Sequence, residues 1–509
     1  MTNDRRLSAR RPRVAMLVAN DVRLDSRVQK AAYSAAEAGY DVLLLGYEPN
    51  RKGRPSDPAY IGAAQVVRTG LHNKWQIAQW PLKDGGAPAL RLMPFRALSF
   101  ASSLDYKARR RIVQRIKEPG TGDGSVKHRA KEALWKVYFR DGDWRRTARH
   151  LLWLESSWSA LIEEFEPDII HAHDMHTPGI AVRVADRLDH KGKRPKVLYD
   201  AHEFVAGVSM PEQRRLAYVG LEGEYVRKAD AVITVSPLLA QWLQERYHLT
   251  ETPGVVANAP MLHLPGEEHE PGGPDADADA KVDTDRDAHV HADPAEAPSL
   301  RKACGLADDV PLLVYSGAVS PMRGIATMVA GLPELPDVHM AVVRGADTEF
   351  TRALEKQAEE LGVADRLHMV GYVAPHLVPQ YLASADIGVI PILHTPNHEV
   401  ALITKYYEYM HAKLPIVVSD VQAMADFTRE LGNGEVFTAE DAHEYAQAVA
   451  KVLADRAAYA SRYTDDLLAA NSWEGQAEVL GGVYARLLGQ EPEPRTGVRA
   501  FGETSEPTA

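Results

Sequence analysis

The sequence predicts an α/β protein built from two doubly wound domains, each with a parallel sheet. Short apolar runs alternate with amphipathic helical segments along most of the chain. One acidic stretch, Gly266–Ala297, interrupts this alternation near the middle. A chain of 509 residues also exceeds the size of one ordinary domain. Strand–helix alternation on both sides of a linker is typical of two parallel-sheet domains.

The first half contains apolar runs that suit strands buried on both faces of a sheet. Helical segments lie between them, and the first helix ends at Gly39, a residue that commonly terminates helices. The predicted strands are Arg13–Ala19, Tyr40–Gly46, Asp168–Ala172, Lys196–Asp200 and Ala231–Val235, and the predicted helices are Asp25–Ala38, Pro178–Leu188 and Pro211–Lys228.

The second half repeats the pattern. Ligands of such sheets bind at the carboxyl ends of strands, so we expect functional residues at these ends. The predicted strands are Leu312–Ser316, His339–Arg344, Leu367–Val370, Ile387–Pro391 and Ile416–Ser419, and the predicted helices are Gly324–Gly331, Glu349–Leu361, Val378–Ala383, Lys405–His411 and Ala442–Asp455.

The composition, 45% hydrophobic and 25% charged, is that of a globular protein. The single cysteine, Cys304, excludes an intrachain disulfide and fits a reducing compartment. No run approaches the ~18 apolar residues of a membrane span, and Val14–Ala19 is too short for a signal-peptide core. We therefore expect a cytoplasmic location, with the inner face of the membrane as an option.

Two segments carry unusual charge. Gly266–Ala297 holds eleven acidic and two basic residues, a net of −9 out of −11 for the chain, and its composition predicts a disordered linker. Asp105–His150 holds fourteen basic and six acidic residues, a net of +8, with tryptophans in or near it. Such a segment suits an anionic membrane surface or a phosphate-bearing acceptor, although a solvated pair of basic helices explains it equally. No nucleic-acid motif accompanies the basic segment, so we expect no nucleic-acid partner.

The segment Asn397–Asp420 is the most informative for chemistry. It predicts a polar loop and then a helix on which Lys405 and Glu408, three residues apart, share one face. A cation near a helix N-terminus can face a diphosphate, and a carboxylate can accept hydrogen bonds from ribose hydroxyls. The alternative is an ordinary surface ion pair. Arg323, before the helix predicted at Gly324, supplies a second cation for a leaving diphosphate, so no divalent metal is obligatory.

Polar side chains also end the strands of the first half. His171, His173 and Asp174 follow one strand, and a His-x-His spacing makes a metal site the competing interpretation. We expect no metal, because aspartate does not directly precede the last histidine, as a dinuclear hydrolase pattern requires. Asp200, His202 and Glu203 end another strand and either orient an acceptor hydroxyl or cap a helix.

Asp21, Arg23 and Arg27 follow the first strand. They are candidates for acceptor contact, although Asp25 as a helix N-cap explains part of the pattern. This turn has no Gly-x-Gly-x-x-Gly sequence, which disfavours a nicotinamide-dependent enzyme.

The chain resembles glycosyltransferases of family 4, which have the GT-B fold. The resemblance covers most of both halves and rests on segments that occur in the family's order. They are NDVRLDSRVQKAAYSAAEAGYDVLLLG, PDIIHAHDMHT, VLYDAHEF, KADAVITVSPLLAQWL, LLVYSGAVSPMRGI, HMVGYV, KYYEYMHAKLPIVVSD and the final helix NSWEGQAEVLGGVYARLL. It implies two facing Rossmann-like domains and a C-terminal helix that crosses back to the first.

The resemblance also implies roles for residues. His173 would donate a hydrogen bond to the transferred sugar and, with Arg323 and Lys405, form the catalytic set; His171 is expected to be structural. The donor would contact Gly317, Arg323, Lys405, Glu408 and Glu399, and the acceptor side would hold Asp21, Arg27, Asp200, His202 and Glu203. Two departures stand out, because Ala318 and Val400 occupy positions where the family usually has arginine and glutamate.

The predicted domains follow from these segments. We expect an N-terminal acceptor domain at 1–258 with a basic insertion at about 73–150, a linker at 259–305, a nucleotide-sugar domain at 306–470, a crossover helix at 471–489 and a disordered tail at 490–509.

The predicted activity is transfer of a sugar, with retention as the resemblance implies, from a UDP- or GDP-sugar to a hydroxyl of a glycan, a lipid-linked sugar or a small molecule. Peripheral membrane contact through residues 105–150 is part of this prediction. The alternatives are a sugar-nucleotide epimerase or hydrolase on the same fold, and a non-catalytic scaffold.

Overall fold

The computed structural model describes residues 10–51, 54–84, 88–116, 143–261, 299–345, 347–374 and 377–491. The whole acidic segment 266–297, the centre of the basic segment at 117–142 and the tail beyond 491 lie outside these residues, and so does the disorder predicted for the first and the last of them. The described chain divides into two compact units. The N-terminal unit contains Met1–Val235, Leu239–Val256 and Ala477–Pro494, and the C-terminal unit contains Ser236–Leu238, Ala257–Gln476 and Arg495–Ala509.

The N-terminal unit is built on an eight-stranded sheet with the order β3-β4-β2-β1-β5-β6-β7-β8. The pairs are parallel except for β3 with β4, which form an antiparallel hairpin at one edge. The strands are β1 (Arg13–Leu17), β2 (Asp41–Tyr47), β3 (Ala59–Ile61), β4 (Ala64–Thr69), β5 (Ile169–His173), β6 (Lys196–Ala201), β7 (Ala231–Thr234) and β8 (Gly254–Val255).

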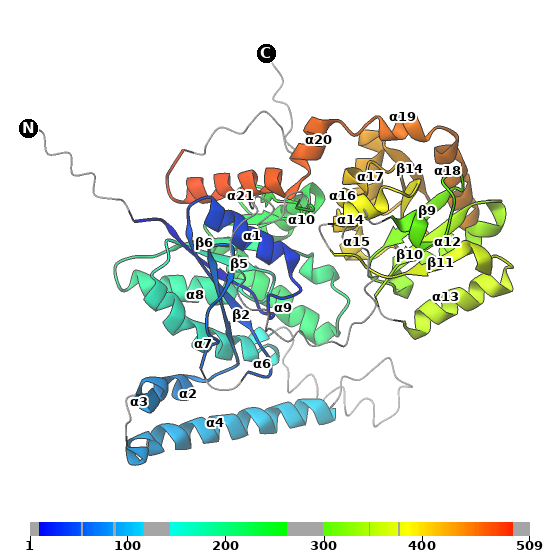
Figure 1. Ribbon diagram of the computed structural model, residues 1–509. Coiled ribbons are helices and arrows are strands. Elements are labelled where there is room, and N and C mark those ends of the chain that lie inside the picture. Colours follow the sequence, from blue (N-terminus) through cyan, green and yellow to red (C-terminus); the bar gives the residue numbers. More distant parts are fainter. Residues whose placement is uncertain are drawn as a thin grey trace, which may run out of the picture. The chain divides into compact units, whose positions relative to one another are not determined.

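Helices cover both faces of this sheet (Figure 1). Two of them begin as their sequences indicate: the Asp25 side chain caps α1 by accepting a hydrogen bond from Val28 N, and Pro178 occupies the first turn of α8. The helices are α1 (Ser26–Glu37), α2 (Lys74–Ala78), α3 (Trp80–Asp84), α4 (Ala89–Ile116), α6 (Trp144–Thr147), α7 (His150–Phe165), α8 (Pro178–Asp189), α9 (Glu212–Tyr225), α10 (Pro237–Tyr247) and α21 (Trp473–Leu487).

The C-terminal unit has a six-stranded parallel sheet with the order β11-β10-β9-β12-β13-β14. Its central strands are fully buried, which explains why their sequences are almost continuously apolar. The strands are β9 (Leu312–Ser316), β10 (His339–Val343), β11 (Leu367–Val370), β12 (Ile387–Ile390), β13 (Ile416–Ser419) and β14 (Gly434–Phe437).

Two apolar clusters pack against the faces of this second sheet. One joins it to α14, α16 and α17, and the other joins it to α12, α13 and α18. The helices are α11 (Leu300–Ala303), α12 (Ile325–Gly331), α13 (Glu349–Glu360), α14 (Val378–Leu382), α15 (Pro396–Val400), α16 (Thr404–His411), α17 (Gln422–Leu431), α18 (Ala442–Ala454), α19 (Arg456–Ala460) and α20 (Asp465–Ala470).

Both sheets are doubly wound, and each has a point where the strand order reverses. These points lie between β1 and β5 in the first sheet and between β9 and β12 in the second. Ligands of such sheets bind outside the carboxyl ends of the strands at this reversal. The predicted fold class, two doubly wound α/β domains with a C-terminal crossover helix, is therefore confirmed.

Some elements differ from the sequence-based prediction. The hairpin β3–β4 and the 28-residue helix α4 were not predicted. Residues 299–305, predicted as the end of the linker, include α11, and Leu300 is fully buried in the C-terminal core. The polar loop expected near Asn397 contains the short helix α15, which Thr395 caps by accepting from His398 N.

Candidate active site

Lys405 lies in the first turn of α16, and α16 is fixed against the end of β9. The Tyr409 hydroxyl accepts a hydrogen bond from Ser316 N (3.0 Å) and donates one to Val314 O (3.1 Å). Gly388 in β12 leaves room for this tyrosine, because a Cβ there would overlap its ring. The helix therefore carries Lys405 to the reversal point between β9 and β12.

The side chain of Lys405 is buried, and its ammonium group contacts the ring and the hydroxyl of a tyrosine. It donates to the Tyr315 hydroxyl (3.1 Å) and lies 4.3 Å from the centre of that ring. It passes directly over Gly317, whose φ is 120° and where a Cβ would lie 2.7 Å from Nζ. Burial, and then the charge of Arg323, lower the pKa of Lys405 to about 7, although Glu408 works in the opposite direction.

Arg323 lies in the tight turn between β9 and α12. Gly324 follows it with a φ of 69°, and a Cβ on this glycine would overlap the carbonyl oxygen of Pro391. The turn is also joined to the segment after β12, because Leu393 N donates to Met322 O (3.1 Å). The helix N-terminus expected near Gly324 is present, but α12 is only seven residues long.

His398 is a residue of this site that sequence reasoning missed. Its Nδ1 lies 2.6 Å from Leu393 O, so the histidine is tied to the turn that carries Arg323. Burial, and the charges of Arg323 and Lys405, lower the pKa of His398, so its ring is neutral near pH 7. Thr395 followed by Pro396 marks a helix start, and that signal could have placed His398 one turn into a helix.

Glu399 has partners of its own beside this site. Its carboxylate accepts from Gln422 N at the start of α17 (2.9 Å) and lies 2.6 Å from His394 Nδ1. Its predicted donor contact therefore stays a prediction. Val400, at the position where the family usually has glutamate, is only 1% exposed.

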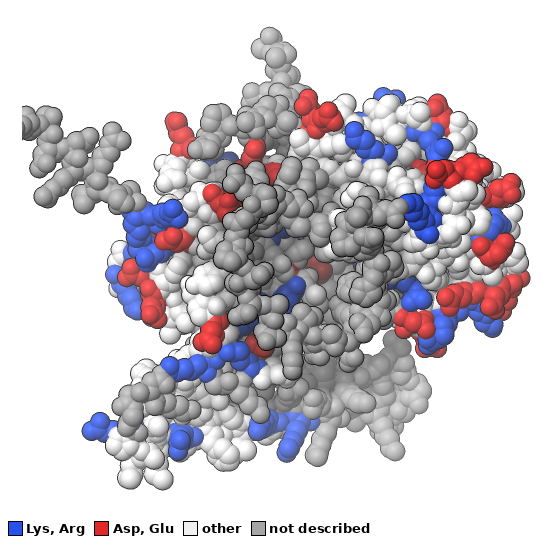
Figure 2. Space-filling view, viewed as in Figure 1, with Lys and Arg blue, Asp and Glu red and all other residues white. Residues whose placement is uncertain are grey.

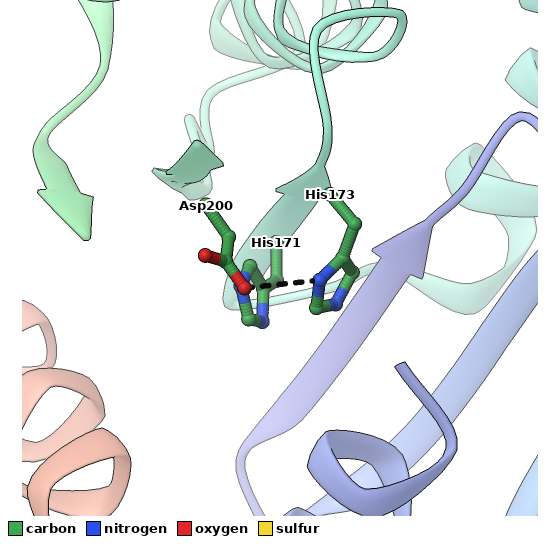
Figure 3. A group of neighbouring side chains, drawn as sticks. All are labelled: His171, His173 and Asp200. Carbon is green, nitrogen blue, oxygen red and sulfur yellow. Dashed lines mark ion pairs between the residues drawn. The ribbon is translucent and has the colours of Figure 1, made fainter. Parts of the chain in front are cut away.

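The polar cluster of the N-terminal unit gathers at the carboxyl ends of β5 and β6. Figure 3 shows His171 and His173 from β5 and Asp200 from β6 with their side chains turned toward one another. Asp200 Oδ2 lies 3.3 Å from His173 Nδ1 and 3.8 Å from His171 Nε2. The other ring nitrogen of His171 is 2.8 Å from the hydroxyl of Tyr484 on α21.

Arg27 from α1 also belongs to this cluster, and its guanidinium favours the ionised form of Asp200. Its Nε and Nη2 donate to the two oxygens of Asp200 (3.0 and 2.8 Å), and its Nη1 donates to Val256 O (2.7 Å). Burial opposes ionisation of Asp200, but the Arg27 charge and the nearby His202 and His173 outweigh it and hold the pKa of Asp200 well below its usual range. Burial lowers the pKa of His173, so that ring is neutral.

This geometry bears on the role expected of His173. A carboxylate beside Nδ1 favours the proton on that nitrogen, which leaves Nε2 with a lone pair. Nε2 is buried and has no hydrogen-bond partner among the described residues. In this arrangement Nε2 of His173 would accept a hydrogen bond, whereas the family resemblance implies that His173 donates one.

The same cluster is the group of possible metal ligands found in the described part of the chain. The nearest ligand atoms of His171, His173 and Asp200 lie within 4.8 Å of one another. A cation bound here would face the Arg27 guanidinium, which already neutralises the only carboxylate in the group. We therefore assign no metal to this cluster.

Two further acceptor-side candidates, His202 and Glu203, directly follow the end of β6. His202 Nε2 lies 3.3 Å from Asp200 Oδ2; burial opposes its protonation, but this carboxylate outweighs burial and raises the pKa of His202. Burial raises the pKa of Glu203, with a contribution from Asp174. Glu203 is therefore a stronger base than Asp200, and a better candidate for accepting a proton from a hydroxyl.

Asp21 forms its hydrogen bonds with residues outside this cluster. Its carboxylate accepts from Arg23 N (3.2 Å), and its backbone oxygen accepts from Arg68 Nε (2.7 Å). Arg27, by contrast, is only 4% exposed, and it donates two hydrogen bonds to Asp200. Acceptor contact by either residue stays a prediction.

Comparison with known families places both units. A model described as glycosyl transferases group 1 matches residues 297–465, and one described as glycosyltransferase family 4 matches residues 120–259. The chain belongs to glycosyltransferase family 4.

Relatives of this family-4 chain are distant. A D-inositol 3-phosphate glycosyltransferase from Geodermatophilus obscurus is 29% identical over 205 residues, which are 38% of this chain and 44% of the relative. The chain spans about half the length of the curated relatives that it matches first.

Solved structures confirm the GT-B fold of the family-4 chain. Sucrose-phosphate synthase from Thermosynechococcus elongatus aligns with a TM-score of 0.60 at 16% identity, covering 94% of this chain and 100% of that one. A trehalose-6-phosphate protein from E. coli, bound with UDP-2-fluoro glucose, aligns with a TM-score of 0.56 at 13% identity, covering the same shares. At these identities the likeness concerns the fold.

Proposed function

We propose that this family-4 chain transfers a sugar from a nucleoside-diphosphate sugar to a hydroxyl group of an acceptor. The observation that carries the proposal is the pair of cations at the end of β9. No ion pair involves Lys405 or Arg323 among the described residues, and Lys405 is buried with a lowered pKa. A buried ammonium without a carboxylate is unfavourable, and a diphosphate would supply the missing negative charge.

The chemistry needs this charge. When the bond between the sugar carbon and the diphosphate oxygen breaks, the electron pair stays on the diphosphate. Arg323 and Lys405 would stabilise that developing charge, and removing one such contact typically raises the barrier by roughly 3 kcal/mol. Glu408, one turn along α16 from Lys405, is proposed to hold the ribose. No metal ion is required by this arrangement.

The donor is proposed to be a UDP- or GDP-sugar. The UDP-sugar bound to the E. coli neighbour supports the UDP form, on the basis of a shared fold. Retention at the anomeric carbon is proposed from family membership. The acceptor is proposed to be a glycan, a lipid-linked sugar or a small molecule, and His173, Asp200, His202 and Glu203 are proposed for the acceptor side.

A thermal-shift panel of UDP, GDP, ADP and TDP with their sugars tests the donor site. A ligand at 100 times its dissociation constant should add about 2.7 kcal/mol of stability. We expect one nucleotide class to stabilise the protein, and Arg323→Ala or Glu408→Ala to remove the shift. Arg352→Ala, a change on the exposed surface of α13, is the matched control. If neither site variant weakened the shift, the donor site would lie elsewhere.

Two alternatives are separated by an activity assay without acceptor and by the thermal-shift panel. Turnover of the donor without an acceptor would indicate an epimerase or hydrolase. The buried Val400 and the uncharged Ala318 favour a non-catalytic scaffold, because two usual polar contacts of the family are missing. Absence of any nucleotide shift would support that reading.

A further inference from the structure

Helix α4 of the N-terminal unit has two apolar faces, and only one of them is covered. The covered face carries Leu92 and Ser99, which are buried, and Phe95, which is half-buried; α2 packs beside the helix. The opposite face exposes large apolar side chains to solvent. They are Leu90 (80% exposed), Met93 (65%), Phe100 (66%) and Leu104 (50%).

These four side chains form one continuous stripe. They follow one another at intervals of three, seven and four residues, and Ala97 fills the position between Met93 and Phe100. Intervals of three and four place residues on the same face of an α-helix. We call this the apolar stripe of α4. Isolated exposed apolar residues are ordinary, but a stripe of this length indicates a contact surface.

Cations flank the stripe. Arg96, Lys107 and Arg111 lie at intervals of three, four or seven residues from its members and are exposed, and Asp105 is the one acidic residue in the sequence of α4. Asp105 in turn lies 4.0 Å from Arg149, which offsets its charge. Figure 2 shows basic and uncharged surface along α4 at the lower edge of the view.

The stripe is not explained by the glycosyltransferase machinery. Residues 89–116 lie outside both segments that match the family models, which begin at 120 and 297. None of the side chains assigned to the donor or the acceptor belongs to α4. The helix is therefore a feature of this chain that needs a role of its own.

We propose that α4 lies on an anionic lipid surface, with the apolar stripe inserted among the acyl chains and the flanking arginines and lysine at the phosphate groups. An aromatic and aliphatic stripe with basic flanks is typical of helices that lie in a membrane interface. No helix in the described part of the chain combines the length and apolar character needed to span a bilayer. A second copy of the chain is a poorer partner, because the basic flanks of two α4 helices would repel each other.

Vesicle sedimentation tests this surface without donor or acceptor, so its outcome is independent of the proposed transferase activity. We expect the full chain to bind vesicles containing about 30% phosphatidylglycerol and not to bind vesicles of pure phosphatidylcholine. Salt should weaken the binding. Phe100→Ser with Leu104→Ser, and separately Arg96→Glu with Lys107→Glu, should each weaken binding roughly tenfold or more. Both pairs are exposed, so the fold should be retained, as thermal unfolding can verify.

Matched controls lie on α13 and beside it. Leu361→Ser removes an exposed leucine, and Arg352→Glu with Lys356→Glu reverses two exposed cations; neither should change vesicle binding. Binding that is equal in the α4 variants and the controls, or absent in the unaltered chain, overturns the proposal. A dimer that dissociates in Phe100→Ser with Leu104→Ser, without vesicle binding, would assign the stripe to a second copy instead.

Discussion

Lys405 and Glu222 are buried ionisable residues whose surroundings shift both pKa values to about 7. Lys405 belongs to the proposed donor site, whereas Glu222 on α9 accepts hydrogen bonds from the hydroxyls of Tyr199 (2.7 Å) and Tyr247 (2.6 Å) inside the N-terminal core. For both groups burial is the largest cause of the shift, and it disfavours the charged form of each. One residue therefore makes binding sensitive to pH, and the other makes stability sensitive to pH.

Donor binding should take up a proton above neutral pH. The free protein holds Lys405 with a pKa of about 7, and a bound diphosphate favours the ammonium form. Affinity for a nucleotide sugar should therefore fall by about tenfold per pH unit above pH 7. Calorimetry in buffers of different ionisation enthalpy measures the proton uptake directly. Lys405→Met should bind more weakly and lose this slope; an unchanged slope would mean that another group titrates.

Glu222 should make the N-terminal unit lose stability as pH rises. Its folded pKa of about 7 exceeds the unfolded value of 4.5, so the folded state binds more protons between these values. The stability present below pH 4.5 should decrease by roughly 3 kcal/mol on the way to pH 7. Glu222→Gln should flatten this part of the curve in thermal unfolding followed across pH. Glu212→Gln, an exposed change on the same helix, should leave the slope as it is.

At the scale of elements, the position of α16 depends on one hydroxyl group. Tyr409→Phe would leave Ser316 N and Val314 O without their partner, at a cost of about 1–3 kcal/mol. Donor affinity should also fall, because α16 carries Lys405. Tyr445→Phe is the matched control, since its buried hydroxyl has no hydrogen-bond partner among the described residues and its loss should cost little. Equal losses in the two variants would show that the hydroxyl of Tyr409 does not hold the helix.

The elements that sequence could predict are the ones with a strong local signal. Central strands such as β9 and β13 lie between helices, so their apolar runs are unbroken and their bounds are predicted to the residue. α4 was missed because its apolar residues occupy two faces, which removes the usual helical alternation of apolar and polar positions.

The site residues, too, could be predicted where the local sequence signal is strong and not where they depend on distant partners. Lys405 could be proposed from its position at a predicted helix start, and Gly317 from the family resemblance. The pairing of Arg27 with Asp200 joins residues 173 positions apart, and neither residue alone indicates the other. The sequence signal of Thr395 and Pro396 could have placed His398 in a helix, but its contact with the backbone oxygen of Leu393 could not be predicted from sequence.

At the scale of the whole molecule, the residues of α21 are divided between the two units. The C-terminal unit includes residues up to Gln476, and the N-terminal unit takes the rest of the helix from Ala477 onward. Leu480, Val483 and Tyr484 are at most 4% exposed, and Tyr484 also contacts Tyr40 with ring centres 5.3 Å apart. The N-terminal core is thus completed by residues from the far end of the sequence.

A chain ending at Gln476 should therefore keep a folded C-terminal unit and lose much of the stability of the N-terminal one. Each large buried side chain removed typically costs about 2–5 kcal/mol, which together rivals the stability of a domain. Hydrogen exchange should show faster exchange in β1, β2 and β5 and unchanged protection in β9 and β13. A chain ending at Gln490, which retains α21, should exchange like the full protein. Unchanged protection of β1 in the shorter chain would contradict this assignment.

This arrangement sets an order of events on the ribosome. The residues that complete the N-terminal unit are synthesised after every strand of the second sheet. The C-terminal unit has all of its described strands and helices once the chain has been synthesised to Gln476, whereas the N-terminal unit still lacks the rest of α21. Of the two units, the one that is translated first is therefore completed last. Until α21 is synthesised, the apolar surface that it covers in the N-terminal unit is exposed, and chaperones would bind there.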